Sequence, residues 1–318
     1  MAFPVGADTF LIIDGHALIY RAYFAFPGLT APDGRLVNAV YGFARILLRA
    51  LQHFSPEYIV VTFDHPKKTF RHEAFEGYKA KRAEMPDDLK PQIALIKEMV
   101  AAFNIPQFEL AGFEADDLIA TLVSQVGEKY PDVAVVIATG DQDAFQLVTD
   151  MVHVWLPPRG KFQSEKEYDA AAVVQKLGVR PDQIPEYKAL SGDSSDNIPG
   201  VKGIGPKTAV SLLELFGTVE KLYAFIDEQG EALSGSGHAL LKGATLTKLT
   251  TDRASALQSR ELATMDRNAP IQLDLAACVV REYDKEKVVK LFEQLNFTSL
   301  IGELPADAFE LSIQESLF

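Results

Sequence analysis

Residues 10–15, FLIIDG, form a short apolar run closed by an aspartate and a glycine, a pattern typical of a buried strand that ends in a turn. The pattern occurs again at residues 58–64, where a second apolar run ends at Asp64. A third run, residues 133–138, leads into Thr139 and Gly140, and Asp141 follows. Three strands that each end at an acid are therefore predicted.

Helices are expected between these strands. Apolar residues recur at helical spacing over residues 41–54 and 114–130, and strands that alternate with helices indicate an α/β fold with a mostly parallel central sheet and flanking helices. Ligands of such sheets bind beyond the carboxyl ends of the strands. Asp14, Asp64, Asp141 and Asp143 all lie there, which makes this edge of the sheet the candidate site.

The composition is that of an ordinary globular chain. It has 318 residues, of which 47% are hydrophobic and 24% charged, and its mean hydropathy is +0.02. We expect neither a membrane span nor a signal peptide. The single cysteine, Cys278, permits no internal disulfide and fits a reducing cytoplasm, so any metal must be held by oxygen or histidine ligands.

Beyond about residue 165 the strand pattern fades and helices separated by glycines follow, at 169–177, 181–190, 206–216 and 284–295. We therefore predict an α/β core over residues 1–175, a helical lobe over 176–300 and a tail or linker over 301–318. Residues 227–238, DEQGEALSGSGH, are expected to be a flexible loop.

Nine acids form one candidate cluster. Taken singly, an aspartate before a glycine indicates only a turn, and Glu-x-Asp-Asp indicates only a helix cap. Nine carboxylates gathered at one edge of the sheet, however, would repel each other without a cation. Oxygen ligands favour Mg²⁺ or Mn²⁺, and so many acids suit two ions that assist phosphodiester hydrolysis. Without these nine carboxylates the net charge of −13 becomes −4. The nine acids are Asp14, Asp64, Glu114, Asp116, Asp117, Asp141, Asp143, Asp193 and Asp196.

Two segments suit a nucleic acid. Residues 199–217, PGVKGIGPKTAVSLLELFG, indicate a glycine hairpin that leads into a helix and can approach a phosphate, with Lys202 and Lys207 beside it; a plain corner between two helices is the structural alternative. Residues 66–82 mix basic and aromatic residues in an acidic chain, which favours a single strand over a solvated helix face, and the segment is expected to be mobile until a strand orders it.

These motifs together resemble the 5′ nuclease family of bacterial polymerases and flap endonucleases. The matching segments include LIIDGHALIYRAYFA, VTFDHPKKTFRHEAFEGYKAKR, GFEADDLIATL, TGDQDAFQLV and LSGDSSDNIPGVKGIGPKTA, and they follow the family's order from about residue 9 to residue 300. The resemblance implies a PIN-like fold, a helical arch at about 66–100, and a helix-two-turn-helix element in the helical lobe.

The resemblance also implies roles for particular residues. It places Asp14, Asp64, Glu114, Asp116, Asp141 and Asp143 in a first metal cluster, and Asp117, Asp193 and Asp196 in a second. Catalytic roles fall on Asp116 and on the arch residues Lys79 and Arg82. The implied DNA contacts are Tyr20, Arg21, Tyr23, Arg71, Tyr78, Lys79, Arg82, Gly200, Lys202, Gly203, Gly205 and Lys207.

The activity implied is Mg²⁺- or Mn²⁺-dependent cutting of DNA at 5′ flaps, nicks and RNA primers during replication and repair, with a possible K⁺ ion at the helix-two-turn-helix element. We expect a monomer in the bacterial cytoplasm that is associated with the nucleoid, with a polymerase domain in the parent protein as a partner. Two alternatives stay open from the residues alone: a nucleic-acid-binding module that does not cut, and a Mg²⁺-dependent phosphatase of small metabolites.

Overall fold

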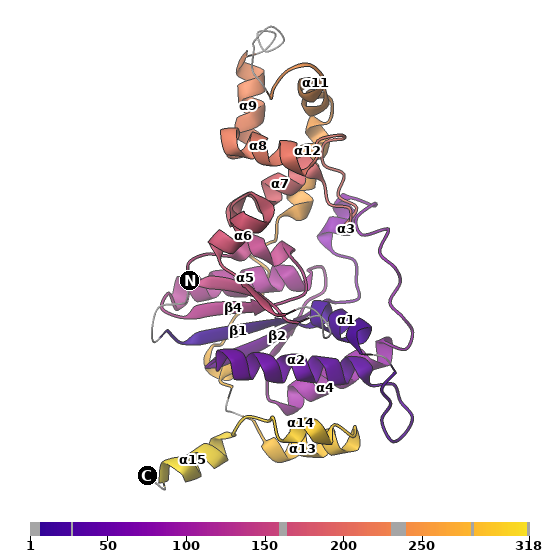
Figure 1. Ribbon diagram of the computed structural model, residues 1–318, viewed down its shortest axis with the longest axis vertical. Helices are drawn as coiled ribbons and strands as arrows, with labels where there is room; N and C mark the ends of the chain where they lie inside the picture. Colours follow the sequence, from indigo (N-terminus) through magenta and orange to yellow (C-terminus); the bar gives the residue numbers. More distant parts are fainter. Residues whose placement is uncertain (1–6, 27, 159–163, 230–239, 281–282, 317–318) are drawn as a thin grey trace.

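The computed structural model describes residues 7–26, 28–158, 164–229, 240–280 and 283–316. A six-stranded sheet lies at its centre (Figure 1), with the strand order β3-β2-β1-β4-β5-β6. The strands are β1 (Thr9–Asp14), β2 (Tyr58–Phe63), β3 (Gln107–Glu109), β4 (Ala134–Ala138), β5 (Val152–Leu156) and β6 (Lys166–Tyr168). All neighbouring pairs are parallel except β5 with β6, which confirms the predicted α/β class.

Alternate residues of the central strands pack on opposite faces of the sheet. Phe10 and Ile12 of β1 belong to the core that contains α5 (Ala115–Lys129). Leu11 and Ile13 belong to the core formed by α1 (Gly15–Ala25), α2 (Asn38–Phe54) and α4 (Lys90–Ala102). Figure 1 shows α5 above the sheet and α2 and α4 below it. Because both faces are covered, these strands are continuously apolar instead of alternating with polar residues.

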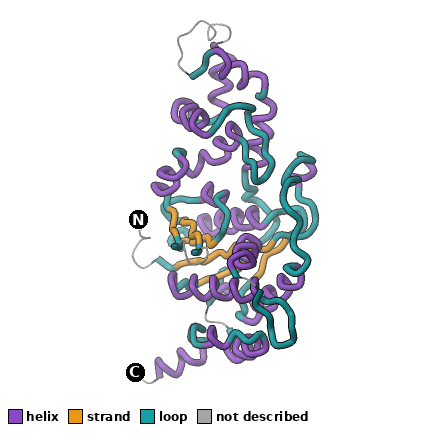
Figure 2. Tube along the Cα trace, turned by 45° about the vertical axis from the view of Figure 1, so that its right-hand side comes forward, coloured by secondary structure: helices purple, strands orange, loops and turns teal. Residues whose placement is uncertain are grey.

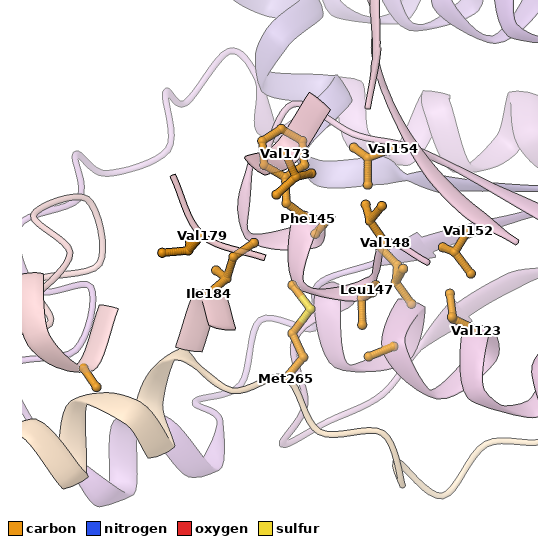
Figure 3. Close-up of a cluster of buried hydrophobic side chains, with 14 of the residues drawn as sticks. Val123, Phe145, Leu147, Val148, Val152, Val154, Val173, Val179, Ile184 and Met265 are labelled. Carbon is orange, nitrogen blue, oxygen red and sulfur yellow. The ribbon is translucent and has the colours of Figure 1, made fainter. Parts of the chain in front are cut away.

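The helical lobe continues from the α5 side of the core. It comprises α6 (Ala170–Leu177), α7 (Ile184–Ser191), α8 (Pro206–Phe216), α9 (Val219–Gln229), α11 (Gly243–Thr251) and α12 (Arg253–Ala263), with the short 3₁₀ turn η2 (Pro181–Gln183) before α7. Two other 3₁₀ turns belong to the core: η1 (Asp143–Leu147) follows β4, and η3 (Ala276–Cys278) precedes Val279, which pairs with β2. Figure 3 shows Phe145 of η1, Val173 of α6, Ile184 of α7 and Met265 in one buried cluster. This shared core fixes the lobe against the end of β4, beside Asp143. The predicted flexible loop lies mostly outside the described residues.

The C-terminal segment differs from the predicted domain boundaries. Val288, Leu291 and Phe292 of α13 (Lys285–Gln294) and Leu300 of α14 (Thr298–Ile301) pack into the core beneath α2 and α4, at the end of the molecule opposite the lobe (Figure 1). An amphipathic helix follows whichever apolar surface it can cover, so its position after the lobe in sequence does not place it in the lobe. Part of the expected tail is helical, as α15 (Ala308–Ser316).

The expected helical arch, residues 66–100, is helical mainly in its last part, where α4 begins at Lys90. Before α4, residues 66–89 contain only the short helix α3 (Phe70–Ala74), and Figure 2 draws most of this segment as loop along one side of the molecule. In the described ranges no helix is both long and apolar enough to cross a bilayer.

Candidate active site

A cavity of about 840 Å³ opens at the carboxyl ends of β1, β2 and β4. Six of the nine predicted acids line it, together with residues of α1, the arch segment and the loop that follows α7. These acids are Asp14, Asp64, Asp116, Asp141, Asp143 and Asp193. The topology therefore brings together carboxylates that lie up to 179 positions apart in the sequence, because parallel strands end at the same edge.

Asp14 caps α1 and at the same time points into the cavity. One of its carboxylate oxygens accepts a hydrogen bond from the Ala17 amide at 3.1 Å, and the other accepts one from the Thr139 hydroxyl at 2.6 Å. Burial, with repulsion from Asp64 and Asp141, raises the pKa of Asp14 to about 7 despite these hydrogen bonds. The fold thus holds a carboxylate where its negative charge is unfavourable without a nearby cation.

Asp64 is held by two neighbours. Its Oδ1 accepts from the Ala115 amide at 2.8 Å, and its own amide donates to Nδ1 of His16 at 2.9 Å. Burial lowers the pKa of His16, so the imidazole is neutral and its Nδ1 serves as the acceptor. His16 lines the cavity and was not predicted as a site residue, because its sequence neighbours give no sign that its ring lies beside Asp64.

Asp116, in the first turn of α5, makes no hydrogen bond or ion pair with any residue that the structure describes. Burial, followed by repulsion from Asp14 and Asp141, raises its pKa well above the ordinary value. The residue is still partly exposed, toward the cavity that it lines. An unpaired carboxylate that lines a cavity among other carboxylates is therefore a candidate ligand for a cation.

Lys188 joins the two predicted groups of acids. Its ammonium forms ion pairs with Asp143 and, at 2.6 Å, with Asp193. Burial raises the pKa of Asp143 to about 7 with help from Asp141, and although burial also opposes ionisation of Asp193, Lys188 lowers the pKa of Asp193 to about 2. Sequence reasoning missed Lys188, because a lysine in a helix is ordinarily solvated and nothing local indicates its burial.

Glu114 and Asp117 lie outside the cavity lining, in a buried network around Arg71. The Arg71 guanidinium donates to both oxygens of Asp117 at 2.8 and 2.7 Å, to Glu114 at 3.3 Å, and to the carbonyls of Leu262 and Thr264 at 2.9 and 2.7 Å. Arg71 is 2% exposed, so this structure leaves it no access to DNA. The network instead ties α3 to α5 and to the end of α12.

Tyr78 is likewise buried and not offered to a base. It is 3% exposed, and its hydroxyl lies 3.0 Å from Glu114 and 3.3 Å from Asp196. Together with Phe75 it packs against Ile198 and Leu262. The basic segment, expected to be mobile, is therefore anchored by a small apolar cluster that its sequence did not reveal.

Lys79 and Arg82 do line the cavity. The Lys79 ammonium lies 2.8 Å from Glu114 and 3.8 Å from Asp196, and the Arg82 guanidinium lies 2.5 Å from Asp196. Asp196 itself does not line the cavity and is largely buried. Lys79 and Arg82 are thus held at the cavity by two acids, Glu114 and Asp196, that do not line it.

The predicted contacts on α1 divide between the cavity and the surface. Tyr20 and Arg21 line the cavity, and Arg21 donates to the carbonyls of Pro157 and Pro158. Tyr23 instead donates its hydroxyl to Asp88 at 2.8 Å. Phe24, which was not predicted as a site residue, also lines the cavity and is 69% exposed. A large exposed apolar ring beside charged groups is a feature of binding surfaces.

The glycine hairpin, residues 200–205, adjoins the same cavity through Pro206. Gly200 has a φ of +61°, and a Cβ there would lie 2.2 Å from the Gly192 nitrogen, so this glycine serves backbone packing. Gly203 has a φ of +78°, while Gly205 caps α8 with open space around it. Lys202 and Lys207 are exposed, and the Lys202 amide donates to Asp252 at 2.9 Å.

Divalent cations fit this site through the chemistry of its donors. Every acid that lines the cavity offers hard oxygen ligands, which Mg²⁺ and Mn²⁺ prefer, and Asp14 and Asp116 carry charges that the fold leaves poorly compensated. Across the described ranges, however, no three Asp, Glu, His or Cys side chains form a ready-made ligand cage. Four of the nine acids, Glu114, Asp143, Asp193 and Asp196, are paired with Lys79, Arg82 or Lys188 instead.

Comparison with known proteins gives matches along most of the chain. Residues 9–178 match the family model for the 5′-3′ exonuclease N-terminal resolvase-like domain, and residues 179–286 match the model for the 5′-3′ exonuclease C-terminal SAM fold. DNA polymerase I of Bacillus caldotenax is 42% identical over 301 residues, covering 94% of this chain and 33% of that protein. For Thermus aquaticus DNA polymerase I the identity is 41% over 293 residues, with coverages of 92% and 32%. The chain thus spans about a third of these relatives.

Solved structures show the same fold at lower identity. A bacteriophage T5 flap endonuclease, in a pseudo-enzyme-product complex with DNA and metal ions, has a TM-score of 0.63 and 22% identity, covering 91% of this chain and 99% of that one. The catalytic core of Rad2 in complex with a DNA substrate has a TM-score of 0.61 and 19% identity, covering 94% and 93%.

Proposed function

Since the chain belongs to the 5′-3′ exonuclease family, whose members hydrolyse phosphodiester bonds, we propose that it cuts DNA at 5′ flaps, nicks and RNA primers, near the junction of single strand and duplex. The observation that carries this proposal is the convergence of six carboxylates on one cavity, flanked by two arch cations and the glycine hairpin. A phosphate brought to that cavity would meet both cations and carboxylates among the side chains that line it.

The reaction is proposed to depend on two or more Mg²⁺ or Mn²⁺ ions. Bound ions of this kind lower the pKa of a water and stabilise the charge of the leaving oxygen. Asp14, Asp64, Asp116, Asp141 and Asp143 would supply the first set of ligands, and Asp193 belongs to the second. The other three acids would not bind the ions directly. Glu114 is paired with Lys79, Asp117 with Arg71, and Asp196 with Arg82, and these ion pairs fix the position of the arch segment.

The other side chains of the site orient the DNA. Lys79 and Arg82 stand where they can exchange their carboxylate partners for a substrate phosphate, which would neutralise charge beside the bond that is cut. Tyr20 and Phe24 offer aromatic surface at the mouth, on which a base can stack. In bacterial cells we place this activity in DNA replication and repair, in the cytoplasm and on the nucleoid. It is carried out by a monomer that is joined to a polymerase domain in the parent protein.

A labelled 5′-flap substrate tests the proposal directly. Incubation with Mg²⁺ should release a short product cut near the junction, and EDTA should stop the reaction while leaving binding measurable. Binding without cutting in Mg²⁺ would make the chain a binding module. If the flap is neither bound nor cut, release of phosphate from small phosphate esters would identify a phosphatase.

Replacing Lys79 and Arg82 together by alanine should slow the cutting of 5′ flaps, because both cations stand at the cavity mouth. If both contact phosphates of the single strand, the slope of log affinity against log salt should shrink by about 1.4, from about 0.7 for each neutralised phosphate. Flap-binding titrations across salt concentrations, with single-turnover cleavage, measure both effects. The matched control is Lys287→Ala with Lys290→Ala, an equal loss of charge at exposed positions of α13, outside the cavity lining. Equal changes in both double variants would remove the proposed role.

Without divalent ions, folding stability should fall as the pH rises from about 4 to about 7. The pKa of Asp14 and of Asp143 is about 7 in the folded chain, mainly through burial, against 3.8 ordinarily. A carboxyl with a raised pKa binds its proton more tightly when folded, so its stabilising contribution is full below pH 4 and is lost as the pH rises through 7.

Urea unfolding in EDTA at pH 5 and pH 8 measures this dependence. The difference in unfolding free energy between the two pH values should shrink in Asp14→Asn, on the order of 2 kcal/mol. Saturating Mg²⁺ should stabilise the wild type at pH 8 more than at pH 5. An unchanged pH dependence in the variant would show that Asp14 is ionised throughout.

A further inference from the structure

The glycine hairpin already has a cation at its backbone. The carbonyl of Gly203 accepts a hydrogen bond from the Lys248 ammonium at 3.1 Å. Other carbonyls of the hairpin are also engaged: that of Gly200 accepts from the Ser255 hydroxyl at 2.7 Å, and that of Gly205 from the Ala209 amide at 3.0 Å. Lys248 comes from α11, a separate helix, so the tertiary fold places this charge.

The stem of Lys248 lies along Gly203. A Cβ built on Gly203 would stand 2.8 Å from Nζ of Lys248, 3.1 Å from its Cε and 3.6 Å from its Cδ. The absence of a side chain at position 203 therefore makes room for the lysine as well as permitting the positive φ. Asp252, four residues after Lys248, accepts from the Lys202 amide and braces the hairpin from the same side.

A free K⁺ ion does not fit beside this lysine. The resemblance implies K⁺ at the hairpin, but a K⁺ bound to the Gly203 carbonyl would stand next to an ammonium that already uses that oxygen, and like charges at such a distance repel. We infer that Lys248 is the hairpin's own cation, takes the place of K⁺, and contacts a backbone phosphate of bound duplex. This inference rests on the proposed function.

The surroundings of the hairpin suit such a contact. Gly205 caps α8, and among the residues that the structure describes, its own chain neighbours aside, none has an atom within 4 Å of where its Cβ would lie. A phosphate can therefore approach the start of an 11-residue helix, whose dipole favours an anion. Lys207 is exposed in the first turn of that helix. A lysine ammonium acts on phosphate as a point charge and therefore needs no particular orientation of the duplex.

The test is duplex binding in K⁺ and in Na⁺ at equal ionic strength. EDTA is present, and the probe is a labelled duplex with a 5′ flap. The wild type should bind with the same affinity in both salts, within about two-fold. Lys248→Met should bind more weakly and lower the salt slope by about 0.9, the value for one duplex phosphate, whereas Lys248→Arg should retain most of the affinity. Lys290→Met, an exposed lysine on α13, controls for the lost charge, and thermal unfolding checks that each variant folds.

The outcomes separate this inference from the proposed function. Wild-type binding that is several-fold tighter in K⁺ than in Na⁺ would overturn the inference alone, as would a Lys248→Met slope equal to that of the wild type. Failure of the wild type to bind duplex in either salt would overturn both.

Discussion

Replacing Asp116 by alanine should abolish cutting while flap binding stays measurable. Asp116 lines the cavity without a hydrogen bond or ion pair to any described residue, so its charge contributes to the site and to no structural contact. Loss of a group that stabilises charge in the transition state costs on the order of 10² in rate or more. Single-turnover cleavage in saturating Mg²⁺ and flap binding in EDTA measure the two properties separately.

The same variant should be at least as stable as the wild type in EDTA. Burial and repulsion from Asp14 raise the pKa of Asp116, which means that its ionised form is unfavourable in the folded chain, and the substitution removes that charge. Glu128→Gln, an exposed acid near the end of the same helix, is the matched control and should cut normally. Near-normal cutting by Asp116→Ala would end its proposed role, and a large loss of stability would mean that the carboxylate holds the fold.

Replacing Arg71 by methionine should destabilise the protein strongly, by about 3–5 kcal/mol, because it leaves buried Asp117 without its ionic partner. The two hydrogen bonds to the carbonyls of Leu262 and Thr264 are lost as well. Urea unfolding at pH 7.5 measures the loss. Arg35→Met, at an exposed ion pair with Asp33, is the control and should change stability by less than about 1 kcal/mol.

A second substitution shows whether the unpaired charge of Asp117 causes the loss of stability in Arg71→Met. In a chain that carries both Arg71→Met and Asp117→Leu, no buried charge is left unpaired at this pair, so part of the lost stability should return. A loss below about 1 kcal/mol for Arg71→Met alone would contradict the structural role assigned here and return Arg71 to the proposed DNA contacts.

The central strands could be predicted from the sequence because burial on both faces leaves them uniformly apolar. Residues 10–13, 58–63 and 133–138 carry that pattern, and β1, β2 and β4 lie there. The three-residue strands β3 and β6 are too short for any periodicity, and β5 contains His153 within an otherwise apolar run. These strands exist because a neighbouring strand offers hydrogen bonds, which no local pattern reports.

The residues of the candidate site likewise include some that could be predicted from the sequence and some that could not. Acids at strand ends could be predicted to converge, since the edge of a parallel sheet is a consequence of topology. Arg71, Tyr78 and Lys188 could not be placed, because the sequence gives the charge of a side chain and not its burial. Arg71 bonds to a carbonyl 191 residues away, and that contact depends on how α12 returns to the core.

The two edges of the sheet have a consequence for the protein in concentrated solution. Its outermost strands, β3 and β6, are only three residues long, and Glu109, Lys166 and Glu167 expose charge on them. An open edge is a template on which another molecule can add a strand, and short charged edges discourage that addition. The apolar strands between them are thereby shielded from intermolecular pairing, and this architecture resists aggregation through its sheet.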